Sequence, residues 1–390
     1  MAPSRNQEPC SLGQLLIYFL RLGAVGFGGP IALAGRMDGD LVEEKGMDIL
    51  RQDYVEGLAF SQLSPGPLAA QLAMYIGWVR AGRLGAAFVA FAFISPSFLM
   101  ATGVAALYIR FERLPWIQDL FYGVGAAVIA IIGQSAYRLS RKTIGADRFL
   151  WALFGLVALT TVITGSEIVS LFVLCGISAV VVKSPPAWLR KTPQLSVAVG
   201  WAALFTGVNG PAPSSVIWTL TFFFLKAGAF VFGSGLAIVP FLYGGVVGQF
   251  HWLTERQFVD AIAVAMITPG PVVITAAFIG FLVAGFVGGS LAAAAVFAPP
   301  FLIVVTVAPY YRRVARNPQV KAFVQGVTAA AVGAIAGAVV ILARRSIVDW
   351  VTVAIALAVL AVLLKARKVP EPLLIAAAGV LGLVLHRAGG

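Results

Sequence analysis

The sequence predicts an all-α polytopic membrane protein: two homologous halves arranged as an inverted repeat, with broken helices or hairpins and about 12–13 hydrophobic segments. Three observations support this fold class. The 390 residues are 60% hydrophobic and 11% charged, with a mean hydropathy of +0.93. Two short signatures each occur twice, at an offset of 203 to 205 residues. Both signatures put helix-breaking glycine and proline inside apolar segments.

The composition fits the bilayer as solvent, because no soluble domain needs so much apolar sequence. The net charge of +12 is carried by short clusters between apolar runs, such as Arg138, Arg141 and Lys142. Such clusters orient loops and meet anionic lipid headgroups, so we expect membrane lipids rather than nucleic acid as partners. Two cysteines, Cys10 and Cys175, form neither a disulfide framework nor a metal cluster, and we expect no metal or cofactor.

The apolar segments recur in the same order in both halves. Those of the first half cover 12–35, 57–79, 84–109, 117–137, 149–165 and 168–182, and those of the second cover 216–248, 258–284, 286–310, 322–343, 347–364 and 370–386. The polar stretch 36–56 holds seven of the sixteen acidic residues. We therefore assign 1–190 to the N-terminal half, 191–215 to a linker or extra span, and 216–390 to the C-terminal half.

The number of segments favours an inverted repeat. With the short apolar run at 195–209, seven segments precede the second copy, and an odd number turns that copy upside down in the membrane. The 216–248 segment exceeds the roughly 20 residues that cross the hydrocarbon. We expect it to tilt strongly, break or fold back as a hairpin.

The first signature reads Gly26-Phe27-Gly28-Gly29-Pro30 in the first half and Phe232-Gly233-Ser234-Gly235 in the second. The second reads Ser64-Pro65-Gly66-Pro67 and Thr268-Pro269-Gly270-Pro271. A broken helix survives in hydrocarbon only against protein or a wet cavity. Where a helix restarts after such a break, its free N–H groups favour an anion. The alternative is that the glycines merely allow close helix packing.

Polar side chains accompany these breaks at matched positions. Ser64 with Thr268, and Gln71 with Thr275, are able to donate hydrogen bonds to the same anion. Arg21 and Lys226 are lone cations in apolar runs, each six residues before a signature phenylalanine. A charge at that depth is costly and suggests an anionic partner, although each side chain can instead snorkel to an interface.

Glu56 and Asp260 are matched carboxylates ahead of the two Pro-Gly-Pro turns. One interpretation is proton coupling, with protonation of the buried carboxylates accompanying transport. The other is plain capping of a helix N-terminus.

The glycine signature at 26–30, Leu-Ser-Pro-Gly-Pro at 63–67, the stretch from Gly77-Trp78 to Gly85-Ala86 and their counterparts resemble the chromate ion transporter family in its long two-domain form. The resemblance covers nearly the whole chain. It implies a multi-pass carrier of the bacterial inner membrane that exports chromate and confers resistance, driven by the membrane potential or a proton gradient. Ser234-Gly235 departs from the commoner glycine run, and Pro30 has no proline counterpart, so the two halves of the site are not equivalent.

Two alternatives remain open: a carrier of sulfate or another oxyanion, and a non-transporting membrane scaffold or lipid-handling protein. An enzyme is not expected, because no nucleophile elbow, zinc-protease or Walker motif occurs. A homodimer is also left open.

Overall fold

The computed structural model describes residues 11–27, 29–44, 49–111, 114–164, 169–185, 213–231, 235–311, 317–365 and 369–388, and these form helices without any strand. The predicted all-α class is confirmed. The first half contains α1 (Leu12–Val25), α2 (Gly29–Asp38), η1 (Gly39–Glu44), α3 (Arg51–Leu63), α4 (Leu68–Phe111), α5 (Pro115–Ile144), α6 (Arg148–Thr164) and α7 (Val169–Lys183). The second contains α8 (Pro213–Ala229), η4 (Gly235–Ile238), α9 (Val239–Leu242), η5 (Tyr243–Gln249), α10 (Glu255–Ile267), η6 (Val272–Ile274), α11 (Thr275–Val307), η7 (Ala308–Tyr310), α13 (Pro318–Ser346), α14 (Trp350–Lys365) and α15 (Glu371–Ala388).

Helices α4 and α11 are each bent back on themselves. The backbone leaves the helical region at Ala81 and Gly82 in α4, where Gly82 has φ +61°, and at Ala284 and Gly285 in α11. Each helix therefore has a short arm, 68–80 or 275–283, and a long arm, 83–111 or 286–307. The arms meet at glycines, Gly77 against Gly85 and Gly280 against Gly288, because a side chain there would strike the facing backbone. The segment boundaries predicted near 80–84 and 285 are confirmed.

The short helices pair into hairpins whose tips are the two signatures. Helix α3 lies antiparallel to the short arm of α4, since Gly57 packs on Tyr75 and the rings of Phe60 and Tyr75 are 5.6 Å apart. Their tip is Ser64–Pro67. The predicted break inside 57–79 is confirmed as a hairpin, but the segment count took 57–79 as a single crossing, and this is wrong because the proline-glycine turn reverses the chain. The same holds for 258–284, where α10 and the short arm of α11 flank the tip 268–271.

The glycine signatures lie between the arms of two further hairpins, and the described residues at these two tips are Gly26, Phe27 and Gly29 in the first half and Val231 and Gly235 in the second. Gly26 contacts Leu33, and Tyr18 of α1 interacts electrostatically with Asp40 of η1, so the predicted single segment 12–35 is also wrong. In the second half the Phe223 ring of α8 stacks on Phe241 at 5.1 Å, which confirms the hairpin alternative for 216–248. A helix of 14 residues is about 21 Å long, short of the hydrocarbon thickness of about 30 Å. These hairpins therefore reach only part of the way across.

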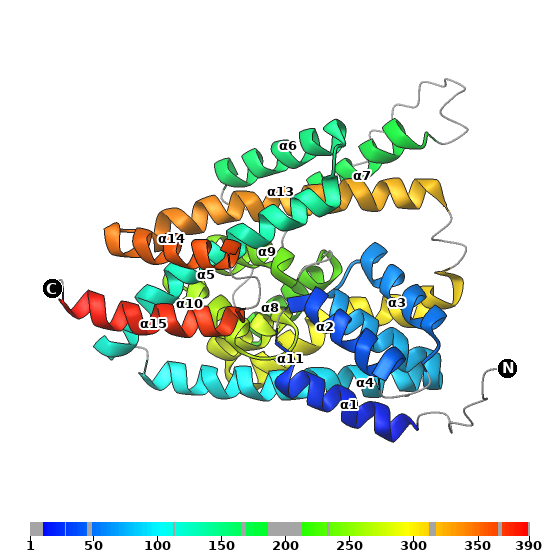
Figure 1. Cartoon of the computed structure of the whole chain (residues 1–390), viewed down its shortest axis with the longest axis horizontal. Helices are drawn as coiled ribbons and strands as arrows, with labels where there is room; N and C mark the ends of the chain where they lie inside the picture. The colour runs from blue at the N-terminus through cyan, green and yellow to red at the C-terminus, as the bar shows by residue number, and fades with distance from the viewer. Residues whose placement is uncertain are drawn as a thin grey trace.

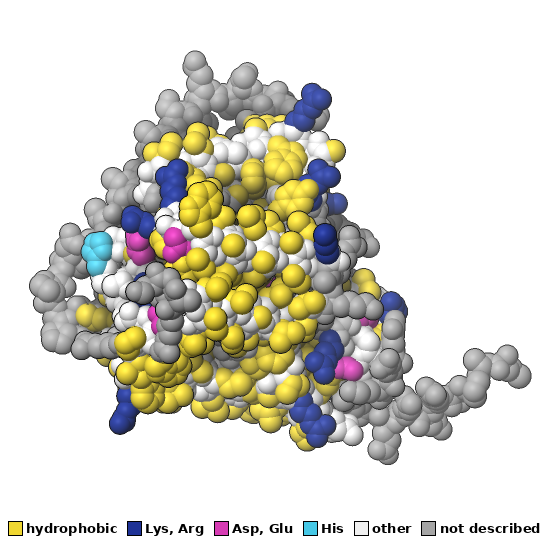
Figure 2. Space-filling model, turned by 60° about the vertical axis from the view of Figure 1, so that its left-hand side comes forward, with side chains coloured by type: hydrophobic (Ala, Val, Ile, Leu, Met, Phe, Trp, Pro, Cys, Tyr) yellow, Lys and Arg dark blue, Asp and Glu magenta, His cyan; other side chains and the backbone are white. Residues whose placement is uncertain are grey.

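Four of the described helices are long and apolar enough to cross a membrane: Leu68–Phe111, Pro115–Arg141, Val272–Tyr310 and Pro318–Ser346. The matched helices α5 and α13 pack antiparallel, with Gly125 near Ser346 and Gly133 near Val339. Equivalent elements that run in opposite directions are what an inverted repeat requires. Figure 2 shows a broad hydrophobic surface with most of the Lys and Arg side chains toward its margins, as expected for a lipid-facing surface.

The last two helices of each half pack on the other half. Helices α6 and α7 of the first half pack on α13 of the second, and α14 and α15 pack on α5 of the first (Figure 1). The contacts are reciprocal, since Gly326 of α13 lies on Cys175 of α7 and the matched Gly123 of α5 lies on Ala378 of α15. Each half thus completes the other. The predicted linker 191–215, with the run 195–209, lies almost entirely outside the described residues.

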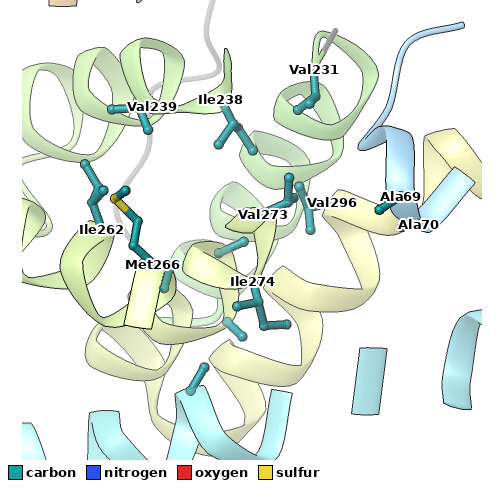
Figure 3. Packing of buried hydrophobic residues seen from close by; sticks show 14 of the residues in the cluster. Ala69, Ala70, Val231, Ile238, Val239, Ile262, Met266, Val273, Ile274 and Val296 are labelled. Carbon is teal, nitrogen blue, oxygen red and sulfur yellow. The ribbon is translucent and has the colours of Figure 1, made fainter. Parts of the chain in front are cut away.

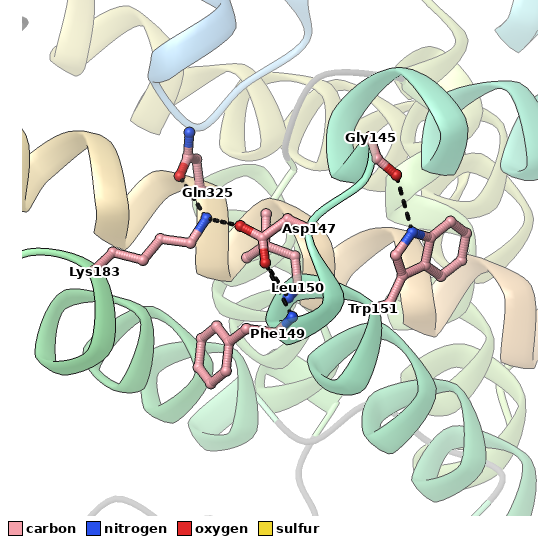
Figure 4. A network of polar contacts seen from close by, with 7 residues as sticks. All are labelled: Gly145, Asp147, Phe149, Leu150, Trp151, Lys183 and Gln325. Atoms are coloured by element: carbon pink, nitrogen blue, oxygen red, sulfur yellow. Dashed lines mark hydrogen bonds and ion pairs between the residues drawn. The ribbon is translucent and has the colours of Figure 1, made fainter.

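Asp147 ties α6 and α7 to α13 (Figure 4). Its carboxylate accepts from the backbone N of Phe149 and Leu150 at 3.0 and 3.1 Å and lies 2.5 Å from Nζ of Lys183, which also donates to Gln325 at 3.1 Å. The hydrogen bond from Lys183 is the main cause that lowers the pKa of Asp147. A lowered folded-state pKa stabilises the protein above the ordinary carboxyl pKa, and this stabilisation disappears as the pH falls through the folded value.

We therefore expect Asp147→Asn to lower the melting temperature of the detergent-solubilised protein at neutral pH. The free energy of unfolding should fall by about 1 kcal/mol or less, because the pair of Asp147 and Lys183 is partly exposed and screened by solvent. Thermal unfolding of wild type and variant at neutral and acidic pH measures it, and the two curves should converge in acid. Equal melting temperatures at neutral pH would contradict the proposed role.

Candidate functional site

The four tips meet at the junction of the two halves. The backbone N of Gly66 donates to the carbonyl O of Val231 at 2.5 Å, and the N of Gly270 donates to the O of Gly26 at 2.9 Å. Each Pro-Gly-Pro tip therefore bonds to the backbone at a glycine signature of the opposite half, since Gly26 begins one signature and Val231 directly precedes the other. Figure 3 shows the apolar packing here, with Val231, Val273 and Ile274 in one buried cluster. The convergence of the two signatures is the central feature of the site.

Glycine is required at both Pro-Gly-Pro tips. Gly66 has φ +140° and Gly270 has φ +101°, a region that side chains rarely adopt. A Cβ at Gly66 would lie 2.7 Å from Cβ of Pro300, and a Cβ at Gly270 would strike Oγ of Ser97. Ser97 and Pro300 occupy matched positions on the long arms of α4 and α11. Each tip is thus held by the long arm of the opposite half.

A small cavity of about 10 Å³ lies between the tips. Its lining consists of Pro30, Leu33, Pro67, Ala69, Gly235, Gly270, Pro271 and Val272, which come from all four tips. Such a volume holds about one water. A tetrahedral oxyanion is larger, so the tips must separate before one can bind.

Helix beginnings surround this cavity. Helices α2 and α4 start at Gly29 and Leu68, and η6, which leads into α11, starts at Val272. In α4 the backbone N of Gln71 bonds to the O of Pro67 at 2.9 Å, so the amides before Gln71 have no acceptor within the helix. Such amides carry partial positive charge and stabilise an anion without any charged side chain.

The polar side chains predicted for the site are buried at the tips, where they brace them in this conformation. The hydroxyls of Ser64, Thr268 and Thr275 donate to the carbonyls of Phe60, Val264 and Val272 at 2.8, 2.6 and 2.7 Å. The Gln71 Nε2 donates to the O of Pro65 at 2.6 Å, while its buried Oε1 has no hydrogen-bond partner. Donation of these hydroxyls to an anion requires them to rotate.

Other predicted residues are not brought to the cavity. Arg21 and Lys226 are exposed, because the opposite faces of α1 and α8 pack through Gly23 and Gly228. Phe27 is 45% exposed. Pro65 is half-buried and Pro269 buried, each next to a tip glycine. Gly28, Phe232, Gly233 and Ser234 lie outside the described residues.

Each matched carboxylate lies near a tyrosine from the other half. Asp260 is 3% exposed and accepts a hydrogen bond from the Tyr108 hydroxyl at 2.6 Å. Glu56 accepts from Nε2 of Gln52 at 3.1 Å and interacts electrostatically with Tyr311. Both carboxylates are the sixth residue of their helix, α3 or α10, so neither lies in a first turn and the capping interpretation does not fit.

Tyr108 and Tyr311 were missed as site residues by sequence reasoning. The signal was present, because both tyrosines and both carboxylates stand at matched positions of the repeat. Their proximity is a property of the fold, since 152 residues separate Tyr108 from Asp260.

Comparison with known proteins adds an independent observation. The family model described as chromate transporter matches residues 13–182 and 218–383. The chain is 53% identical over 376 residues to a chromate transport protein of Cupriavidus metallidurans, covering 96% of this chain and 94% of the relative. It is 52% identical over 377 residues to a probable chromate transport protein of Synechococcus elongatus, covering 96% and 95%. A chromate transport protein of Pseudomonas aeruginosa is 30% identical over 355 residues, covering 86% and 82%. No solved structure matches.

Proposed function

The chain belongs to the chromate transporter family, and from this premise we propose that it exports chromate from the cytoplasm across the bacterial inner membrane and so confers chromate resistance. The observation that supports this most is the meeting of four interrupted tips, with helix N-termini, at one cavity between inverted halves. Broken helices at the junction of inverted repeats are the usual substrate site of secondary transporters. The protein acts as a carrier rather than an enzyme.

Substrate binding follows from the tips. Chromate is a tetrahedral dianion, and the amide ends of α2, α4 and the η6–α11 segment supply partial positive charge on several sides of the cavity. Ser64, Gln71, Thr268 and Thr275 contribute hydrogen bonds once their hydroxyls and amide turn toward the anion. Opening breaks or lengthens the bonds from Gly66 to Val231 and from Gly270 to Gly26, which join the halves in this conformation. Alternating access is then a movement of one half against the other.

Energy comes from the membrane potential or a proton gradient. We assign proton coupling to Asp260 and Glu56, since ionisable residues within membrane segments commonly form proton relays. Each lies on the same hairpin as a Pro-Gly-Pro tip and near a tyrosine of the other half. Protonation there alters a contact between the halves, and this is how proton binding and tip opening are linked.

Arg21 and Lys226 are assigned an indirect role. Since both are exposed, we expect them to raise the local concentration of the anion through its charge rather than to touch it. Arg21→Gln and Lys226→Gln should each raise the KM for chromate by about two- to threefold at low salt, and the effect should vanish at high ionic strength. Initial uptake rates at two salt concentrations measure this. A loss that persists at high salt would place the residue in direct contact with the anion.

The proposed function is tested with the purified full chain in proteoliposomes. Chromate should move under an imposed pH gradient or potential, and sulfate, a dianion of nearly the same shape, should compete. Transport of sulfate with exclusion of chromate would favour the alternative substrate. Absence of transport of any tetrahedral dianion, with no reaction of cysteines introduced beside Gly66 and Gly270 toward a water-soluble maleimide, would favour a membrane scaffold.

A further inference from the structure

A second pocket, of about 190 Å³, lies away from the tips, where α10 begins and α4 passes into α5. Its lining is Tyr108, Ile117, Gln118, Phe121, Thr254, Arg256, Gln257 and Asp260. The pocket is far larger than the cavity between the tips, and it is open to the surface at one end of the long helices. It has room for a tetrahedral oxyanion together with several waters.

Arg256 is the one cationic residue among those that line this pocket. Arg256 is exposed on the first turn of α10, and its guanidinium donates to the carbonyl O of Gln118 at 3.1 Å. This hydrogen bond fixes the side chain beside the pocket and leaves other N–H groups of the planar fork for a ligand. Arginine matches the geometry of an oxyanion bidentately and is more weakly hydrated than lysine. The side-chain amide of Gln118 also lines the pocket and can donate to a ligand.

The remaining charges around the pocket limit what it binds. Asp260 lies in its wall and accepts from Tyr108 of α4 at 2.6 Å. Glu255 also lies at the start of α10, but it pairs with Nε of Arg345 at 3.1 Å and accepts from the Tyr243 hydroxyl at 3.1 Å, and neither Glu255 nor Arg345 lines the pocket. Among the residues that line the pocket, Asp260 is the one carboxylate, and an anion bound next to Arg256 repels the charged form of that carboxylate.

The repeat provides an internal reference for this pocket. The positions that match Arg256, Gln257 and Asp260 in the first half are Gln52, Asp53 and Glu56. The guanidinium is thus replaced by an amide, and a second carboxylate is added. Tyr108 and its match Tyr311 are the same in both. The arginine is therefore not needed for the fold of this hairpin, because the equivalent hairpin forms with glutamine.

We propose that this pocket is a second anion site, in which Arg256 holds an oxyanion at one membrane face on its path to or from the tips. The inference rests on the proposed transport of an oxyanion. It adds a binding residue outside both signatures and places the coupling carboxylate Asp260 beside the waiting substrate. The proton on Asp260 and the anion at Arg256 then occupy this same pocket, which we call the vestibule of Arg256. The binding of each therefore favours the binding of the other.

The first test is Arg256→Gln, which installs the residue of the matched position and so preserves the hairpin. In proteoliposomes with chromate supplied on the side of this pocket, KM should rise about tenfold while kcat changes by less than about twofold. Arg256→Lys should recover only part of the affinity, because it restores the charge without the fork. Arg110→Gln, which removes a charge near the same end of α4 but not from the pocket, should leave KM unchanged at high ionic strength, where long-range attraction is screened.

The second test measures binding without transport. In a variant with Cys10 and Cys175 changed to alanine, Thr254→Cys should react with a membrane-impermeant maleimide, and chromate or sulfate should slow the reaction at least about fivefold. Adding Arg256→Gln should abolish this protection. Protection in a protein that does not transport would retain the anion site and reject the proposed function. Transport with an unchanged KM in Arg256→Gln, and no protection at Thr254→Cys, would reject the anion site alone.

Discussion

Replacing Gly66 or Gly270 with alanine is expected to reduce chromate transport at least about tenfold, with the protein still folded and inserted. Both residues have positive φ, which costs a residue with a Cβ about 1–3 kcal/mol, and both lie where a Cβ meets the opposite half. Their backbone N atoms also make the hydrogen bonds that join the halves. The added methyl group displaces the tip amide from its carbonyl acceptor. A rise of about 1.4 kcal/mol in the activation free energy of transport already lowers the rate tenfold. Initial uptake into proteoliposomes measures the effect.

The chain offers matched controls for this result. Gly82 has φ +61°, but no atom lies within 4 Å of the position that a Cβ would take, so Gly82→Ala introduces strain without collision and should transport well. Ser97→Gly removes the side chain that obstructs Gly270→Ala, and the double variant should regain part of the activity. Full activity of Gly270→Ala, with normal elution of the purified protein, would show that the tips need not close in this manner.

Asp260→Asn is expected to lower chromate accumulation driven by a pH gradient at least about tenfold while sparing exchange of chromate for chromate. Asparagine has nearly the same shape and can still accept from Tyr108, but it cannot bind and release a proton. Because exchange needs no net proton movement, the variant separates binding and tip movement from coupling. Counterflow and gradient-driven uptake measured on the same vesicles give the two readouts.

Glu56→Gln is the matched control for Asp260→Asn. Equal losses in both variants would indicate that the two carboxylates act in the same cycle, and a loss in Asp260→Asn alone would make the vestibule of Arg256 the coupling side. Gradient-driven accumulation at the wild-type level in both variants would remove proton coupling from these residues.

Much of the site could be predicted because each signature occurs in both halves of the repeat. The tips at Gly66 and Gly270 follow from proline and glycine in an apolar setting, where few other conformations are available. Hydropathy does not reveal that the chain reverses there, since a helix that continues after a break and one that turns back have the same composition. The segments 12–35 and 57–79 were each counted as a single crossing for this reason.

The direction in which a single side chain points could not be predicted from the sequence. Whether Arg21 points to the tips or to the surface depends on which side of α1 packs through Gly23, and this depends on where α4 lies. The pairing of Tyr108 with Asp260 likewise requires that α4 of one half meet α10 of the other. Such contacts between distant segments leave no local pattern.

The exchange of α6 and α7 onto α13, and of α14 and α15 onto α5, has a consequence for biogenesis. When only the first half has been synthesised, α13, on which α6 and α7 pack, is still absent. So is Ala378, which packs on Gly123. The nascent protein must therefore stay incompletely assembled in the bilayer until its last helix has been inserted. A stop codon anywhere before α15 then leaves a product that quality-control proteases should recognise, however many spans it already contains.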